Sequence, residues 1–198
     1  MKQIKSKKRV ADFGEVFTNE REVKAMCDLV EDETQKIGSR FLEPACGEGV
    51  FLIEIITRKL EIITKKYKKQ SDWEKLSLLA LSSLYGIDIL ADNCKATKEN
   101  LFNVWNSYYN KLFNSQDENV KHSAKKILNY NIINGNTLTM HLVDKTQKDT
   151  GEYITFQKWL LKGDVFLKVS FSLIELLENN GTSNKEKKVY SYYYKDIK

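Results

Sequence analysis

The stretch RFLEPACGEGVF, residues 40–51, joins a short apolar run to a turn with two closely spaced glycines. Residues 40–43 have the composition of a short buried strand, and apolar side chains recur at helical spacing from residue 50 onward. In open parallel sheets, ligands bind where such a strand meets the start of a helix. Gly47 and Gly49 allow the backbone to approach a ligand closely, because neither carries a Cβ. The stretch therefore predicts an α/β fold with a ligand site after its first strand.

The same turn favours one class of ligand. Exposed N–H groups at the start of a helix suit a carboxylate, and the side chain of Glu43 suits an ammonium group. A ligand with both groups is an amino acid rather than a pyrophosphate. The turn has neither the GxGxxG pattern of dinucleotide-binding sheets nor the GxxxxGK(S/T) pattern of phosphate-binding loops. A single GxG turn is also common as a structural feature, so the rest of the sequence must decide.

Two later segments end predicted strands at the same edge of the sheet. Asp88 closes the strand LYGID, residues 84–88, at the position where nucleoside-binding sheets place an acceptor for the ribose hydroxyls. The next residue, Ile89, is suited to cover one face of an adenine. The segment NGNTL, residues 134–138, follows a third predicted strand at 131–133. Singly, these segments fit a helix cap and an ordinary turn, but their order after the glycine turn favours a shared site.

Helical periodicity and turn residues predict the other elements. A capping box formed by Asn19 and Glu22 predicts an N-terminal helix after a flexible basic lead-in at residues 1–12. Further helices are expected at 50–65, 73–83, 92–113 and 121–129, strands at 154–156 and 166–169, a turn at 134–136, a helical turn or two at 173–177, and an edge strand or disordered tail at 189–198. The order α-β-α-α-β-α-β predicts a partial doubly wound sheet with an added N-terminal helix.

The length of 198 residues suits one domain with a small appendage. We expect residues 1–150 to form the ligand-binding domain and residues 151–198 a C-terminal extension with candidate edge strands and a basic, tyrosine-rich tail. Three widely spaced cysteines argue against a disulfide framework and a zinc site. No apolar stretch approaches the roughly 18 residues of a membrane span, and the N-terminus lacks the apolar run of a signal peptide. These features predict a cytoplasmic protein that does not enter a membrane.

Taken in order, these segments resemble the adenine-N6 DNA methyltransferases of restriction–modification systems. The family's cofactor loop, (D/E)PACGSGx(F/L), matches residues 43–51 with a glutamate in place of serine. Its N-terminal segment, close to G(Q/E)(F/V)(F/Y)TP, matches residues 14–19 with an asparagine in place of proline. Its ribose motif Gx(D/E) matches residues 86–88, and its G(D/N)(S/T/A)L turn matches residues 135–138. Four matches in the family's own order make the resemblance specific.

The resemblance implies a Rossmann-like, S-adenosylmethionine-dependent methyltransferase fold, with a role at the cofactor for each matched residue. Phe17 and Thr18 would contact the methionine end of the cofactor. The loop around its amino-acid moiety would be formed by Glu43, Ala45, Cys46, Gly47 and Gly49. Its nucleoside would be held by Asp88 at the ribose, Ile89 against the adenine ring, and Asn136 with Leu138 at the adenine edge. Asn136 stands where aspartate is usual, which keeps hydrogen bonds to adenine available in a changed pattern.

The family's catalytic motif, (D/N/S)PP(Y/F/W), is missing from the sequence. In the family its polar groups accept hydrogen bonds from the target amino group and its ring stacks on the flipped base. The one proline of this chain, Pro44, already belongs to the cofactor loop. The chain is also too short for a seven-stranded methyltransferase sheet plus a target-recognition domain. The resemblance therefore implies a subunit or fragment that binds S-adenosylmethionine and DNA, and whose activity needs a partner chain with the catalytic motif.

Two other functions remain open from the sequence. A degenerate methylase that binds cofactor or DNA without turnover is supported by the missing motif. A small-molecule methyltransferase would share the GxG loop and Asp88, but the FT pair before the first helix and the EPACG loop favour the DNA-directed group. The net charge of +5 fits a nucleic-acid partner weakly, because each lysine run taken singly fits a solvated surface better.

Overall fold

The computed structural model describes residues 6–13, 15–16, 18–178 and 187–198. Within these ranges the helices are α1 (Lys7–Phe13), α2 (Glu20–Asp28), α3 (Glu31–Thr34), α4 (Val50–Lys66), α5 (Gln70–Ser82), α6 (Ala91–Leu112), α7 (Glu118–Asn131) and α8 (Leu173–Glu178). The strands are β1 (Phe41–Glu43), β2 (Leu84–Asp88), β3 (Ile132–Asn136), β4 (His141–Val143), β5 (Asp149–Tyr153), β6 (Thr155–Lys162), β7 (Val165–Ser172) and β8 (Val189–Tyr193).

The central sheet is mixed and has the strand order β1-β2-β3-β4-β5. Strands β1, β2 and β3 are parallel, with Phe41 opposite Leu84 and Gly86 opposite Ile132. Strands β4 and β5 extend the sheet in antiparallel pairing beyond β3. The first three strands are parallel because helices connect them, α4 and α5 between β1 and β2 and α6 and α7 between β2 and β3. The α/β class predicted from the sequence is therefore confirmed.

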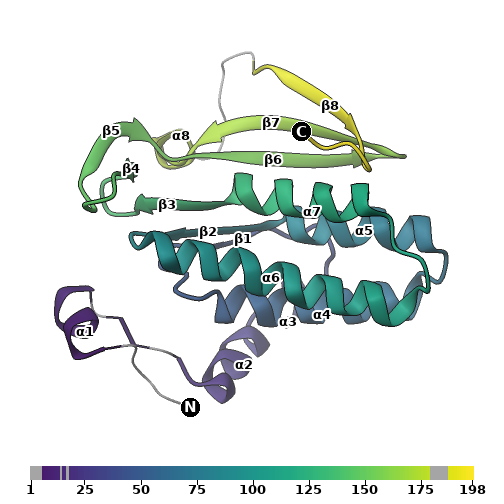
Figure 1. Ribbon diagram of the computed structural model, residues 1–198, viewed down its shortest axis with the longest axis horizontal. Helices are drawn as coiled ribbons and strands as arrows, with labels where there is room; N and C mark the ends of the chain where they lie inside the picture. The colour runs from purple at the N-terminus through teal and green to yellow at the C-terminus, as the bar shows by residue number, and fades with distance from the viewer. Residues whose placement is uncertain (1–5, 14, 17, 179–186) are drawn as a thin grey trace.

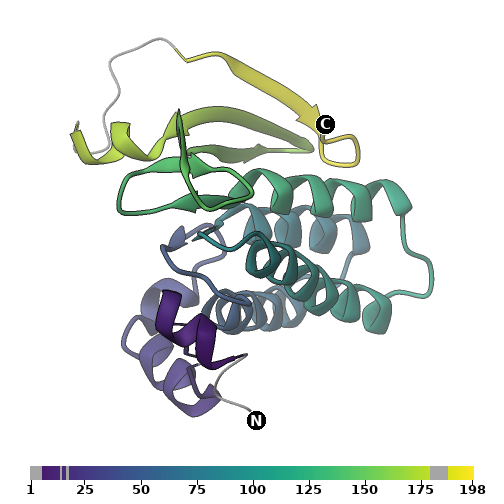
Figure 2. The ribbon, with the colours of Figure 1, turned by 60° about the vertical axis from the view of Figure 1, so that its left-hand side comes forward.

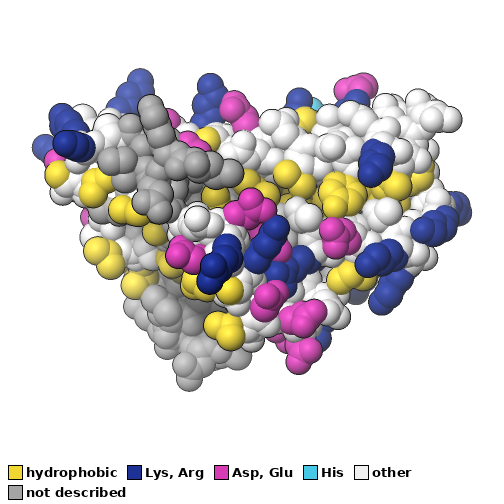
Figure 3. Space-filling model, turned by 90° about the horizontal axis from the view of Figure 1, so that it is seen from below, with side chains coloured by type: hydrophobic (Ala, Val, Ile, Leu, Met, Phe, Trp, Pro, Cys, Tyr) yellow, Lys and Arg dark blue, Asp and Glu magenta, His cyan; other side chains and the backbone are white. Residues whose placement is uncertain are grey.

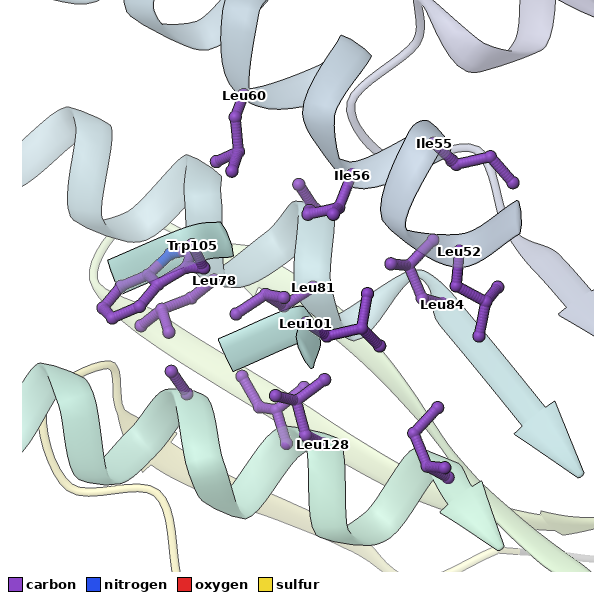
Figure 4. Packing of buried hydrophobic residues seen from close by; sticks show 14 of the residues in the cluster. Leu52, Ile55, Ile56, Leu60, Leu78, Leu81, Leu84, Leu101, Trp105 and Leu128 are labelled. Atoms are coloured by element: carbon purple, nitrogen blue, oxygen red, sulfur yellow. The ribbon is translucent and has the colours of Figure 1, made fainter. Parts of the chain in front are cut away.

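The main hydrophobic core lies among α4, α5, α6 and α7. Figure 4 shows the side chains that meet there, which include Ile56 and Leu60 of α4, Leu78 and Leu81 of α5, Leu101 and Trp105 of α6, and Leu128 of α7. Leu60 and Leu81 are fully buried, and each contributes about 2 kcal/mol through the apolar area removed from water. The indole of Trp73 stacks on the ring of Tyr109 with 5.4 Å between centroids, which ties α5 to α6. This core holds the helices that position the ends of β1 and β2.

The two faces of β2 are buried by different layers. Leu84 points into the main core, whereas Tyr85 and Ile87 join a second cluster with Phe156 of β6. The rings of Tyr85 and Phe156 lie 5.2 Å apart, and the Tyr85 hydroxyl donates to the backbone oxygen of Gln157 at 3.1 Å. Because side chains alternate along a strand, every second residue of β2 faces each layer. All five residues of β2 are buried as a result.

Strands β6, β7 and β8 form a separate antiparallel sheet. In Figures 1 and 2 this sheet forms a layer over α5 and α7. Trp159 and Phe166 of this sheet join the main core, and the Tyr194 hydroxyl donates to buried Glu74 of α5 at 3.1 Å. The expected boundary after residue 150 falls inside β5, and residues on both sides of it share one core.

Three features differ from the sequence-based expectations. The order β1-β2-β3 does not reverse, so α4 and α6 lie on one face and β6 with β7, rather than helices, covers the other (Figure 1). This differs from a doubly wound sheet, because right-handed crossovers in one direction place their helices on one side. Residues 7–13 form α1 instead of a flexible lead-in. The segment 134–136 continues β3, since Gly135 pairs with Leu142, and the turn comes after it.

Other expectations are confirmed. The Asn19 side chain accepts from the Arg21 N–H at 3.0 Å, and the Asn19 N–H donates to Glu22 at 3.3 Å, which forms the predicted capping box of α2. Of the two alternatives for residues 189–198, the edge strand is the one observed. None of the helices in the described part of the chain is both long and apolar enough to cross a membrane.

Candidate functional site

A cleft of about 550 Å³ lies at the carboxyl ends of β1, β2 and β3. Four segments that are distant in the sequence contribute described residues to its wall: Asp12, Glu15, Val16 and Thr18 from the first, and residues within 44–51, 88–93 and 135–138 from the others. Eight of the residues predicted from the sequence line this cleft: Thr18, Ala45, Cys46, Gly47, Asp88, Ile89, Asn136 and Leu138. The arrangement follows from the fold, because parallel strands end at one edge and their connecting turns gather there.

Two other predicted residues, Gly49 and Glu43, have different positions, and a third lies outside the described residues. Gly49 lies just behind the cleft as the residue that precedes α4. Glu43 is half-buried and does not line the cleft; its carboxylate accepts a hydrogen bond from the backbone of Ala45, and burial raises its pKa. Glu43 thus supports the turn rather than facing the ligand space. Phe17 lies outside the described residues.

The glycine turn is held against α6. Gly47 and Gly49 have φ angles of +53° and +87°, a left-handed conformation that favours glycine. A Cβ on Gly49 would lie 2.8 Å from Cγ2 of Thr97, so this position excludes larger residues. The Thr97 hydroxyl donates to the Gly47 carbonyl at 2.8 Å, and the Cys46 N–H donates to the Ile87 carbonyl at 2.8 Å. These contacts fix the turn between β1 and α4.

Asp88 connects the turns that follow β1 and β2. One carboxylate oxygen accepts from the Gly47 N–H at 2.8 Å, and the other accepts from the Leu90 N–H at 2.9 Å and from Asn93 Nδ2 at 3.3 Å. The side chain is buried, which raises the pKa of this carboxyl, while these hydrogen bonds act in the opposite direction. A carboxylate has about four acceptor sites, so Asp88 can still accept a hydrogen bond from a ligand hydroxyl.

A polar cluster that adjoins Asp88 through Asn93 was missed by the sequence reasoning. Arg9 of α1 donates to both carboxylate oxygens of Glu15 and to Asp92 at 2.6 Å. Asn93 also donates to Glu15, at 2.8 Å, and these carboxylates raise the pKa of Arg9. The sequence held two signals for this cluster: Glu15 lies in the segment before α2, and Asn93 follows shortly after Asp88. The cluster anchors α1 beside the cleft.

The cleft wall is acidic. Among the described residues that line it, Asp12, Glu15, Glu48 and Asp88 carry carboxylates, and none is lysine or arginine. Arg9, behind the wall, balances part of this charge. Carboxylates in a concave, partly buried wall attract a cationic ligand and repel phosphate groups. The sign of the charge therefore limits the class of ligand that can bind here.

The turn after β3 forms the rim of the cleft. The Asn136 side chain accepts from the Leu138 N–H at 3.0 Å, and the Thr137 hydroxyl donates to the Pro44 carbonyl at 2.5 Å. These bonds connect the rim to the glycine turn. Leu138 is 92% exposed, so an apolar side chain stands at the mouth of the cleft. A flat apolar ligand group would cover this side chain.

The rest of the described surface shows no comparable site for chemistry. No group of three His, Cys, Asp or Glu side chains that could hold a metal ion occurs among the described residues. On the face drawn in Figure 3, basic and acidic side chains are interspersed instead of forming one broad basic surface. No family model, curated protein or solved structure matches the chain. Functional inference therefore depends on the cleft itself and on the sequence motifs that line it.

Proposed function

We propose that the chain binds S-adenosylmethionine in the cleft. The observation that carries this proposal is the juxtaposition of Asp88, a buried carboxylate at the end of β2 that suits the ribose hydroxyls, with an acidic wall that contains no described cation. S-adenosylmethionine combines a nucleoside with an ammonium and a sulfonium group, and it has a net positive charge. Nucleotides that carry phosphates have the opposite charge and fit this wall poorly.

The chain's residues suit each part of this cofactor. The first N–H groups of α4, at Val50 and Phe51 on the cleft wall, have no partner within the helix and suit the carboxylate. Asp88 suits the ribose hydroxyls, and Ile89 with the exposed Leu138 suits the adenine faces. When bound, the cofactor supplies an electrophilic methyl group. In this proposal the residues of the cleft wall bind and orient the cofactor.

We further propose that the chain is the cofactor-binding subunit or fragment of an adenine-N6 DNA methyltransferase, cytoplasmic and dependent on a partner. Four family-like segments support the class of reaction, and all four contribute residues to the cleft. The dependence on a partner follows from the single proline, Pro44, which leaves no residues for the catalytic motif. The acidic cleft disfavours DNA phosphates, so the DNA would present only a flipped base to this edge of the chain.

The same absence of a catalytic motif favours a second candidate, a degenerate methylase that binds the cofactor without turnover. The two candidates differ in one observable. If the chain and a co-purified partner together transfer a labelled methyl group to DNA, the chain is a methyltransferase subunit. If no label is transferred in the presence of that partner, the chain is a degenerate methylase. A small-molecule methyltransferase would transfer the label without DNA.

Titration calorimetry of the purified chain tests the cofactor site. We expect S-adenosylmethionine to bind and ATP, which has the same nucleoside with phosphates, to leave the chain unaffected. Asp88→Asn weakens binding by about tenfold, the loss expected when a charged hydrogen-bond acceptor becomes neutral. Glu118→Gln serves as the matched control, because the Glu118 side chain is exposed at the start of α7 and pairs with Lys121. Tight binding of ATP, or unchanged binding in Asp88→Asn, contradicts the proposal.

A further inference from the structure

A second hollow lies on the opposite side of β1 from the helices. It has a volume of about 530 Å³, and its wall is apolar and aromatic, with Phe41, Leu42, Tyr85, Phe156 and Phe171. A smaller hollow of about 270 Å³ continues it toward β6 and shares Gly38, Arg40 and Tyr85 with the first. We call the two together the β1 groove.

The β1 groove runs along an open sheet edge. Strand β1 pairs with β2 on one side, and no described strand pairs with its other side. The Phe41 N–H donates to the Ser83 carbonyl on the β2 side, so by alternation the backbone groups of Leu42 face the open edge. Leu42 is 42% exposed, so this edge is accessible from solvent. An open edge with unpaired backbone groups is a template for an added strand.

The charged residues that line the β1 groove are all basic. Arg40 and Lys158 line it, and none of the described lining residues is acidic. Neither Arg40 nor Lys158 makes an ion pair or a side-chain hydrogen bond with another described residue. Two cations that flank an aromatic hollow thus remain available to a partner. Their charge is the reverse of the charge in the cofactor cleft, so the two sites select different ligands.

We infer that the β1 groove binds an extended segment of a partner polypeptide in which a large apolar residue lies two positions from an acidic residue on either side, so that these side chains share one face of the added strand. The backbone of the segment pairs with Leu42, one large apolar side chain fills the hollow beside Tyr85, and acidic side chains meet Arg40 and Lys158. The open backbone edge favours a polypeptide over a nucleic acid, because a nucleic acid would leave the Leu42 groups unpaired. The inference goes beyond the cofactor site and does not depend on what binds there.

Fluorescence anisotropy with a short synthetic peptide tests the inference. The probe has phenylalanine flanked by aspartates two positions away on either side, with threonine at the positions between, so that phenylalanine and the aspartates lie on one face of the strand. Its first control replaces every aspartate by lysine. We expect the acidic probe to bind and the lysine peptide to bind at least about tenfold more weakly, since two charge contacts change sign. A second control carries N-methyl groups on alternate amides, which blocks strand pairing while keeping the side chains. Its binding is expected to be lost.

Variants of the chain test the same surface from the other side. Arg40→Glu with Lys158→Glu is expected to reverse the preference, so that the lysine peptide binds better than the acidic one. Both side chains lie on the surface of the groove and leave the fold intact, which the circular dichroism spectrum checks. We expect the double variant to bind S-adenosylmethionine with unchanged affinity. Peptide binding and cofactor binding are therefore tested independently, and one proposal can fail without the other.

Four results overturn the inference. The first is no binding of the acidic probe at millimolar concentration, and the second is equal binding of the N-methylated peptide. The third is displacement of the probe by oligothymidylate, which would assign the groove to nucleic acid. The fourth is a dimer in light scattering that dissociates in Leu42→Asp, which would assign the groove to a second copy of the chain.

Discussion

The carboxylate of Asp88 accepts a hydrogen bond from the backbone N–H of Gly47 at 2.8 Å, across two turns that are 41 positions apart in the sequence. The turn after β1 and the turn after β2 are therefore one rigid unit. This unit forms the floor of the cleft, and Asp88 both supports the floor and faces the ligand space. We expect a substitution at Asp88 to affect both the stability of the chain and the proposed binding of S-adenosylmethionine, so the two effects must be measured separately.

Asp88→Ala leaves the Gly47 and Leu90 N–H groups without their acceptor in a mostly buried site. Loss of a hydrogen-bond partner for buried donors costs about 1–3 kcal/mol, and we expect that decrease in the free energy of unfolding in urea. Asp88→Asn keeps one acceptor oxygen and is expected to lose less. If Asp88→Ala were as stable as the unchanged chain, these hydrogen bonds would not support the floor.

Gly49→Ala tests the packing of the glycine turn on α6. The new methyl group would lie 2.8 Å from Cγ2 of Thr97 at a φ of +87°, and we expect a loss of about 1–3 kcal/mol in the free energy of unfolding. Gly38→Ala is the control, because no atom lies within 4 Å of a Cβ there. Adding Thr97→Ser removes Cγ2 and restores part of the loss. A Gly49→Ala chain that is no less stable than Gly38→Ala contradicts the packing.

The sequence predicted the parallel core of the fold well, because local signals determine it. The strand LYGID has the predicted bounds, since its five residues are buried and a turn and a helix flank it. The turn residues around Gly47 and Asp88 also came together as expected, because parallel strands end at one edge.

Long-range contacts account for what the sequence did not show. Helix α1 is anchored by Arg9 through contacts with Asp92, 83 positions away, and no local pattern signals such a partner. Strands at 154–156, 166–169 and 189–198 were among the expectations, but the sequence did not show that they form a separate sheet over Tyr85, for a similar reason. A buried strand face shows that some layer covers it, but the covering layer can be a helix or a sheet.

Lys59 gives the stability of the chain a distinctive pH dependence. Its side chain is fully buried in α4, where it donates to the carbonyls of Ile37 and Ser39 and to the hydroxyl of Ser83. Burial lowers the pKa of Lys59 to about 7, against about 10.4 in the unfolded chain. Between these values the unfolded chain binds the proton and the folded chain does not, so the free energy of unfolding rises with pH.

We expect this group to add about 2 kcal/mol between pH 7 and pH 9, because one pKa unit corresponds to about 1.4 kcal/mol and Lys59 is already half-neutral at pH 7 in the folded chain. Urea unfolding at both pH values measures it. Lys59→Met is less stable overall, since three acceptors lose their donor, but it lacks this rise. Parallel pH profiles for the two chains would show that Lys59 keeps its charge when folded.

The acidic cleft predicts a preference between the cofactor and its demethylated product, provided that S-adenosylmethionine binds there. The product, S-adenosylhomocysteine, differs from the cofactor only in lacking the methyl group, so its sulfur is neutral. With four carboxylates on the wall, we expect S-adenosylmethionine to bind about 3–10 times more tightly, a Coulomb difference of about 1 kcal/mol for a charge at several ångströms in a partly hydrated site. Asp12→Asn removes one wall carboxylate and should lower the ratio of the affinities for S-adenosylmethionine and S-adenosylhomocysteine. A higher salt concentration should lower this ratio in every variant. Both compounds could bind with equal affinity in low salt. That result would show that the wall carboxylates do not stabilise the positive charge on the sulfur.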